Sequence, residues 1–280
     1  MSGGQLILAA TPLGNILDAS PRLKQSLQEA DLIAAEDTRR AKRLFADLSL
    51  EIKAPIISLF EENEIEKIPD LIEKLKNGSK VVVISDAGTP AISDPGYRLV
   101  SAAIEENISI TVIPGPSAVI SALVLSGLPT DRFSFEGFIA RKGKERTEIL
   151  NNLTTQSRTT VLFESPRRTL QTLIDIQEIV GDERKAAVVR EISKTYEEVI
   201  RGTLKELVKW ALDTEVLGEI TLVIQGVDNT GKKEVNDAAI QNVKQLVDAG
   251  SSFKDAVQEV STQRGLSRRE LYEASLRLDT

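Results

Sequence analysis

The residues best suited to chemistry lie in a loop, Ser85 to Gly96, with the sequence SDAGTPAISDPG. It follows the apolar run VVVIS, and the carboxylate of Asp86 can accept a hydrogen bond from a ribose hydroxyl or an ammonium group. Gly88 lets the main chain lie against a ligand, while the prolines stiffen the rest. The alternative is a structural turn in which Asp86 caps its own backbone, but long ordered loops usually bind something. The sequence therefore predicts a small-molecule site here.

Two other loops in the first half of the chain combine proline, glycine and polar residues. In TPLGN, Thr11 to Asn15, Pro12 fixes a rigid φ, and Gly14 allows either sign of φ or a close backbone approach. In PGPSA, Pro114 to Ala118, Ser117 offers donors beside a helix N-terminus, which suits a carboxylate ligand. A tight turn and ordinary helix capping are the respective alternatives.

A fourth loop, FESPRR, Phe163 to Arg168, ends a strand in the second half. The structural alternative for this loop is that Glu164 pairs on the surface with Arg167 or Arg168, an interaction that contributes little stability.

The elements that must position these loops alternate between strand and helix. In the first half, apolar runs separated by helical periodicity predict strands at 6–10, 32–35, 55–59, 81–85 and 109–113. This alternation predicts a parallel sheet, in which the uniformly apolar VVVIS strand is covered on both faces. Because ligands bind at the carboxyl ends of strands in open α/β sheets, the loops after these strands are expected to meet at one edge.

The second half predicts another sheet and then a helical tail. Strands are expected at 132–136, 159–164, 185–190, 197–202 and 219–225, and helices at 144–153, 166–180 and 203–212. The 197–202 strand closely follows its predecessor, so part of this sheet should be antiparallel. The tail, 236–278, should be helical, with Ser267 and Glu270 at capping-box spacing.

We therefore predict an α/β fold with two α/β domains and a small C-terminal helical domain. The first domain, 1–126, carries a parallel sheet and ends at a hinge in Ser126 to Pro129. The second domain, 127–228, carries a mixed sheet, and the helical domain covers 234–280.

The composition excludes several classes of chemistry. The 280 residues contain no cysteine and no histidine, so disulfides, thiolate or imidazole zinc sites and Ser-His or Cys-His catalysis are impossible, and no metal is expected. Any acid or base must be Asp, Glu, Lys or Tyr. The sequence shows neither a signal peptide nor a membrane-spanning run, which predicts a cytoplasmic protein.

Nucleotide-binding motifs are also missing. No G-x-G-x-x-G occurs, and the nearest P-loop candidate, GFIARKGKE, has the wrong spacing and Glu145 where Ser or Thr belongs. Nicotinamide-dependent hydride transfer and phosphoryl transfer therefore have no support.

Taken together, the loops resemble a known family. The chain is similar to the tetrapyrrole methylase superfamily, and within it to the bacterial methyltransferases that modify the ribose 2′-hydroxyl of a cytidine in the decoding region of 16S rRNA. The matching segments are TPLGN (11–15), AAEDTRRA (34–41), ISDAGTPAISDPGYRLV (84–100), IPGPSA (113–118), LPTDRFSFEGF (128–138), FESPRR (163–168), REISKTYEE (190–198) and GEITLVIQG (218–226).

This resemblance implies S-adenosylmethionine (SAM) as cofactor, held in the cleft between two α/β domains, and a homodimer. The cofactor contacts it implies are Leu13, Asp86, Gly88, Ile92, Ser117, Ala118, Phe163, Glu164, Gly218, Glu219 and Ile220. Relatives often have histidine at the position of Arg167, and an arginine cannot act as a base at neutral pH.

Methyl transfer to a ribose hydroxyl also needs a group to accept the hydroxyl proton. With no histidine, the candidates are Glu36, Asp37, Glu164, Glu191 and Lys194. The alternative for each is an ion pair: Glu36 or Asp37 with a neighbouring arginine, and Glu191 with Lys194 if that stretch is helical.

An RNA substrate must be bound by local cations, because the net charge is -7. The RNA-binding candidates are Arg39, Arg40, Arg43, Arg141, Lys142, Lys144, Arg167, Arg268 and Arg269, from clusters that also contain Lys42, Arg146 and Arg264. Such clusters are otherwise solvated faces. Two other functions remain open: SAM-dependent methylation of a tetrapyrrole, and non-enzymatic binding of RNA or DNA through a helix-turn-helix in 253–276.

Overall fold

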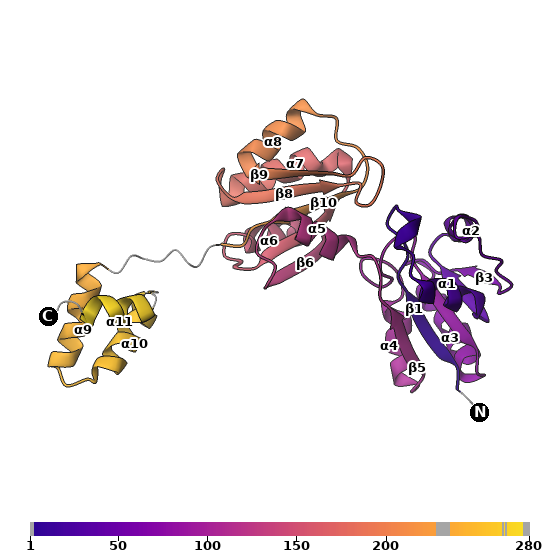
Figure 1. The fold of residues 1–280 in the computed structure, drawn as a ribbon, viewed down its shortest axis with the longest axis horizontal. Coiled ribbons are helices and arrows are strands. Elements are labelled where there is room, and N and C mark those ends of the chain that lie inside the picture. The colour runs from indigo at the N-terminus through magenta and orange to yellow at the C-terminus, as the bar shows by residue number, and fades with distance from the viewer. Residues whose placement is uncertain (1–2, 228–235, 265, 267, 277–280) are drawn as a thin grey trace. The chain divides into compact units, whose positions relative to one another are not determined.

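The structure, a computed structural model, describes residues 3–227, 236–264, 266 and 268–276. Residues 1–226 form one compact unit and residues 227–280 a second, each described by itself below (Figure 1). The first unit contains two sheets. None of the helices in the described ranges is long and apolar enough to cross a membrane.

The first sheet is parallel throughout, with the strand order β3-β2-β4-β1-β5. Its strands are β1 (Gln5–Ala9), β2 (Leu32–Ala35), β3 (Ile56–Ser58), β4 (Lys80–Ile84) and β5 (Ser109–Ile113). β4 lies in the middle, and its side chains from Val81 to Ile84 are at most 2% exposed. The predicted parallel sheet with a doubly covered VVVIS strand is confirmed.

Helices cover both faces of this sheet: η1 (Ile16–Asp18), α1 (Pro21–Gln28), α2 (Thr38–Asp47), α3 (Glu64–Lys76) and α4 (Tyr97–Glu105). Because successive side chains on a strand alternate between faces, Val82 and Ile84 pack with α1 and α2, whereas Val81 and Val83 pack with α3 and α4. Ser20 caps α1 by accepting from the Leu23 amide, and Pro21 occupies the first helical turn.

The second sheet is mixed, with the order β6-β7-β10-β8-β9. Its strands are β6 (Phe133–Phe138), β7 (Thr159–Glu164), β8 (Lys185–Arg190), β9 (Glu198–Thr203) and β10 (Ile220–Ile224). β6 and β7 are parallel, and the other neighbouring pairs are antiparallel, including β8 with β9 as predicted. The expected mixed sheet is confirmed.

One face of the second sheet packs against α6 (Lys144–Asn152), α7 (Pro166–Val180) and α8 (Leu204–Asp213). The other face packs against α5 (Ala118–Ser126), whose Val119, Ala122 and Leu123 share a cluster with β7, β8 and β10. The chain therefore joins the second sheet already at α5. This packing favours a domain boundary near Pro114 to Ser117, earlier than the predicted one after residue 126, which remains a prediction.

The second unit contains α9 (Asp237–Asp248), α10 (Phe253–Arg264) and α11 (Arg268–Leu276). Their apolar side chains form a small core, and Phe253 stacks edge-on against Tyr272 with ring centroids 5.2 Å apart. The helical tail is confirmed. The predicted cap at Ser267 and the end of the predicted tail lie outside the described residues.

Candidate functional site

A cleft of about 470 Å³ collects the ends of the loops singled out in the sequence. Every residue predicted as a cofactor contact lines it: Leu13, Asp86, Gly88, Ile92, Ser117, Ala118, Phe163, Glu164, Gly218, Glu219 and Ile220. Residues 13 to 118 follow strands of the first sheet or begin α5, and residues 163 to 220 lie at one edge of the second. The volume lies within the range of small-molecule sites.

Hydrogen bonds join three of these loops. Thr11 and Gly88 form an antiparallel bridge, in which the Thr11 amide donates to the Gly88 carbonyl at 2.8 Å and the Gly88 amide donates back at 3.1 Å. The Thr89 hydroxyl donates to the Pro116 carbonyl at 3.1 Å. Gly88 has a φ of +84°, a conformation that favours glycine, and a Cβ there would also press against the end of the Leu13 side chain at 3.2 Å.

Gly14 fulfils the prediction of a close approach. A Cβ at this position would lie 2.2 Å from Cγ of Lys194, in the turn after β8. The loop after β1 is therefore packed against a loop of the second sheet, and any larger residue at position 14 would push them apart.

The far end of the 85–96 loop is held by a buried carboxylate. Glu64, 2% exposed, accepts from the amides of Gly96 at 3.1 Å and Leu99 at 3.0 Å, and pairs with Arg98 at 3.6 Å. Since Gly96 precedes α4, Glu64 satisfies amides at the start of this helix and anchors the loop.

Substituting Glu64 by alanine is therefore expected to lower the free energy of unfolding by on the order of 2–4 kcal/mol, because two buried amides lose their acceptor. Urea denaturation measures this value. Glu66→Ala, an exposed position on the same helix, should change it by less than about 0.5 kcal/mol. Equal effects of the two substitutions would refute the anchoring role.

Asp86 is bound across strands. One of its oxygens accepts from the Asp37 amide at 3.1 Å, and the other lies 3.3 Å from Arg40. Its own amide donates to Glu36 at 3.1 Å. The Asp86 carboxylate therefore binds groups from another part of the chain, and the alternative in which it caps its own backbone was wrong. Burial raises the pKa of Asp86 and also that of Glu36, which lines the same cleft.

Asp94 is a cleft residue that the sequence analysis missed. Burial raises its pKa to about 7, the nearby charges of Glu36 and Asp86 add to this effect, and the Ser85 hydroxyl opposes it. Among the described residues, Asp94 has no ion-pair partner. Its place in SDPG, within the loop already singled out, was the available signal. The sequence could not indicate its burial.

Three of the predicted proton acceptors do not line the cleft. Asp37 caps α2 and pairs with Arg39 at 2.7 Å, and the hydrogen bonds from Arg39 hold its pKa well below the usual range. Glu191 and Lys194 pair at 2.9 Å in a turn with no helix, where Glu191 has a φ of +52°. The ion pair was expected only if this stretch is helical. It forms although the stretch is a turn.

The Glu191–Lys194 pair instead holds Glu219, a residue that lines the cleft. Glu191 accepts from the Glu219 amide at 2.9 Å, and Lys194 lies 3.1 Å from the Glu219 carboxylate. Although burial opposes both shifts, these bonds lower the pKa of Glu191 and raise that of Lys194. Both groups are therefore charged at neutral pH.

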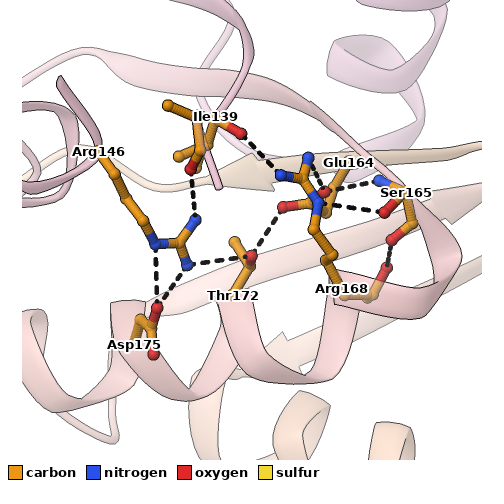
Figure 2. A network of polar contacts seen from close by, with 9 residues as sticks. Ile139, Arg146, Glu164, Ser165, Arg168, Thr172 and Asp175 are labelled. Carbon is orange, nitrogen blue, oxygen red and sulfur yellow. Dashed lines mark hydrogen bonds and ion pairs between the residues drawn. The ribbon is translucent and has the colours of Figure 1, made fainter. Parts of the chain in front are cut away.

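Glu164 lies at the end of β7 and is 2% exposed, so the alternative was wrong in placing its ion pair on the surface. It does pair with Arg168, at 2.6 Å, and also accepts from the Ser165 amide and the Thr172 hydroxyl, each at 2.7 Å (Figure 2). Arg167, the other partner considered, is exposed. The Glu164 carboxylate is therefore already held by Ser165, Arg168 and Thr172.

Aromatic side chains form part of the cleft wall. Phe163 packs against Phe138 with ring centroids 5.4 Å apart and against Phe135 at 4.9 Å. Phe138 is 57% exposed and lines the cleft together with the 45% exposed Ile92. These apolar surfaces can cover a flat ring.

All the predicted RNA-binding cations are exposed: Arg39, Arg40, Arg43, Arg141, Lys142, Lys144, Arg167, Arg268 and Arg269. Arg40 is the member of this set that lines the cleft. Several form local pairs, such as Arg43 with Asp47 and Arg269 with Glu273. Arg268 and Arg269 belong to the second unit.

A family model and curated relatives show the family of this chain, and solved structures share its fold. Residues 5–208 match the model for Tetrapyrrole (Corrin/Porphyrin) Methylases. Ribosomal RNA small subunit methyltransferase I of Mycobacterium tuberculosis is 48% identical, over 99% of this chain and 96% of that protein, and its namesake in Synechocystis is 40% identical, over 99% of each. Uroporphyrin-III C-methyl transferase from Thermus thermophilus, solved in complex with S-adenyl homocysteine, has a TM-score of 0.55 at 17% identity, covering 80% of this chain and 97% of that one.

Proposed function

Because this chain belongs to the tetrapyrrole (corrin/porphyrin) methylase family and is a SAM-dependent methyltransferase, we propose that it methylates the ribose 2′-hydroxyl of a cytidine in the decoding region of 16S rRNA. The substrate class follows from relatives named as small-subunit rRNA methyltransferases that match over nearly their full length. The observation that carries the proposal is the gathering of all the expected cofactor contacts around one cleft.

The residues of this cleft fit the cofactor. Leu13, Ile92 and Phe163 provide apolar surface for the adenine, and the Asp86 carboxylate suits its ribose hydroxyls. Ser117, at the N-terminus of α5, suits the carboxylate of the methionine portion. When bound, SAM supplies a methyl group activated by the positively charged sulfur.

The proton acceptor that the contacts favour is Asp94. The other cleft carboxylates already have partners. Asp86 pairs with Arg40, and Glu219 pairs with Lys194. Glu36 accepts a hydrogen bond from a main-chain amide, and Glu164 accepts several hydrogen bonds. Asp94 keeps free acceptor capacity, and its pKa of about 7 suits a base at neutral pH. Asp94 would accept the proton that the ribose 2′-hydroxyl loses when its oxygen takes the methyl group that SAM would supply.

The choice of methyl acceptor tests the proposed function. The protein is incubated with methyl-labelled SAM and either small ribosomal subunits that lack the modification or a tetrapyrrole such as uroporphyrinogen. Label in the 16S rRNA supports the proposal, and label in the tetrapyrrole alone supports the alternative methylase. Label in neither acceptor would revive the non-enzymatic RNA binder, for which α10 and α11 are the candidate element.

Binding to RNA should depend on salt, because each cation that neutralises a phosphate releases counterions. For single strands, the slope of log K against log salt is about -0.7 per contact. Arg141→Ala and Lys142→Ala are each expected to make this slope shallower by about 0.7, whereas the exposed Lys209→Ala is the control that should not. A slope near zero for the unmodified protein would contradict RNA binding.

A homodimer and a cytoplasmic location complete the proposal. Ile120 and Val124, four residues apart on α5, are 48% and 66% exposed and together form an apolar surface that a second copy of the chain can cover. If they lie in a subunit interface, Val124→Glu should convert a dimer into monomers in sedimentation experiments. A monomeric unmodified protein would refute the dimer. The cytoplasmic location follows from the ribosomal substrate.

A further inference from the structure

The segment 139–144, which runs from the end of β6 to the first residue of α6, combines an exposed basic surface with a fixed backbone. Arg141, Lys142 and Lys144 are exposed, yet two carbonyls just before them are held by arginines. Arg168 donates from Nη1 to the Ile139 carbonyl at 3.1 Å, and Arg146 donates from Nη1 to the Ala140 carbonyl at 3.2 Å. The start of the basic segment is therefore held by helices α6 and α7.

Both arginines connect to the same carboxylate. Arg168 pairs directly with Glu164 Oε1, while Arg146 donates to the Thr172 hydroxyl at 3.3 Å, which in turn donates to Glu164 Oε2 at 2.7 Å (Figure 2). Asp175 completes the set as the ion-pair partner of Arg146. We name Arg146, Glu164, Arg168, Thr172 and Asp175 the β7–α7 network.

The β7–α7 network also reaches the cleft. Glu164, Ser165 and the preceding Phe163 line the cleft, and the Ser165 amide donates to Glu164 Oε1 at 2.7 Å. The residue before Ile139 is Phe138, which lines the cleft as well. One set of side chains thus fixes both the cleft wall and the first residues of the basic segment.

Stabilisation alone does not account for such a network. Replacing buried ion pairs with apolar side chains of similar volume is often neutral or stabilising. Two features point to positioning instead: the guanidinium groups hold specific carbonyls in a fixed fork geometry, and Arg146, whose side chain is 12% exposed, has its donors directed inward.

We propose that the residues of the β7–α7 network are positioning residues. They hold the backbone of the basic segment 139–144 in a fixed place relative to the cofactor cleft, so that this segment can bind RNA there. Arg146 then acts through the backbone of this segment and does not itself contact phosphate, in contrast to its place in a sequence cluster of RNA-binding cations. This inference rests on the proposed function, since it concerns how the same site receives RNA.

Asp175→Asn gives a test in which electrostatics and positioning predict opposite changes in the strength of RNA binding. Removing a negative charge should strengthen RNA binding if charge alone matters. Loss of the ion pair with Arg146 should instead raise the KM for small ribosomal subunits about 10-fold, while the Kd for SAM stays within about twofold. Asp182→Asn removes an exposed negative charge two residues after α7, outside the network, and is the matched control, with unchanged KM.

Arg146→Lys is the second variant, since it keeps the charge but cannot hold the Ala140 carbonyl, Thr172 and Asp175 together. It should raise the KM for RNA with an unchanged salt slope. Arg146→Met should leave the slope unchanged as well, and a slope shallower by about 0.7 would show direct phosphate contact and overturn the proposal.

The outcomes separate the network from the proposed function. A lower melting temperature in Asp175→Asn and Arg146→Lys, with an unchanged KM for RNA, would mean a purely structural role and also overturns the inference. Failure of the unmodified protein and of Asp182→Asn to label RNA would instead contradict the proposed function. If Asp175→Asn does not fold, the KM of Arg146→Lys decides.

Discussion

Replacing Asp94 with asparagine is expected to lower kcat by about 10²- to 10⁴-fold, the usual contribution of a positioned general base. The amide is similar in size and shape but cannot take up the hydroxyl proton. The Kd for SAM, measured by calorimetry, should change little, because the fit of the cofactor rests on Asp86 and the apolar wall. Asp47→Asn, on the exposed side of α2, is the control for a loss of negative charge.

The pH dependence gives the same prediction a second readout. With the pKa of Asp94 near 7, the reactive carboxylate form is populated above that value. The kcat/KM should therefore rise with pH through about 7 and level off above it. The residual activity of Asp94→Asn should lack this rise. A variant that keeps more than about a tenth of the activity, or the same pH profile, would rule out Asp94 as the base.

Unfolding is not expected to explain the loss of activity. The pKa of Asp94 is raised in the folded state, so the folded protein retains a proton between about pH 4, the ordinary value, and about pH 7. By linkage, the contribution of this group to stability is present below about pH 4 and is lost as pH rises towards 7. Asparagine removes that loss, so the melting temperature of the variant at pH 8 should equal or exceed that of the unmodified protein.

Asp86→Ala is expected to raise the Kd for SAM by about 10- to 100-fold, because hydrogen bonds to a charged group contribute about 1.5–3 kcal/mol. The substitution removes the acceptor that faces the cleft and also releases the Asp37 amide and Arg40. Asp86→Asn keeps an acceptor oxygen and should lose less affinity. Binding by Asp86→Ala as tight as that of the unmodified protein would remove Asp86 from the cofactor site.

Much of the fold could be predicted because local patterns and tertiary packing agree. The predicted strand 81–85 is apolar from Val81 to Ile84, and β4 is indeed covered on both faces. The α5 segment shows the limit of such patterns. Its sequence is apolar on every side, so periodicity cannot tell which sheet it packs against, and the structure shows it on the second sheet.

The full set of cofactor contacts was implied by the family resemblance and stays a prediction. The cleft loops themselves were predictable where they follow strand ends with special residues such as Gly88. The polar contacts were less so, since they depend on burial and on partners distant in sequence. Glu164 is buried because α7 packs Thr172 and Arg168 against it. The pKa of Asp94 is raised because the folded chain buries its carboxyl group in the cleft. Neither effect leaves a pattern in the linear sequence.

The most direct test of the central claim is to locate the methyl group on the RNA. After reaction with methyl-labelled SAM, small-subunit rRNA is hydrolysed with alkali, which cannot cleave after a ribose that carries a 2′-O-methyl group. We expect the label in an alkali-stable dinucleotide that contains a cytidine of the decoding region. Label on a base, or on a ribose elsewhere in the RNA, would contradict this account.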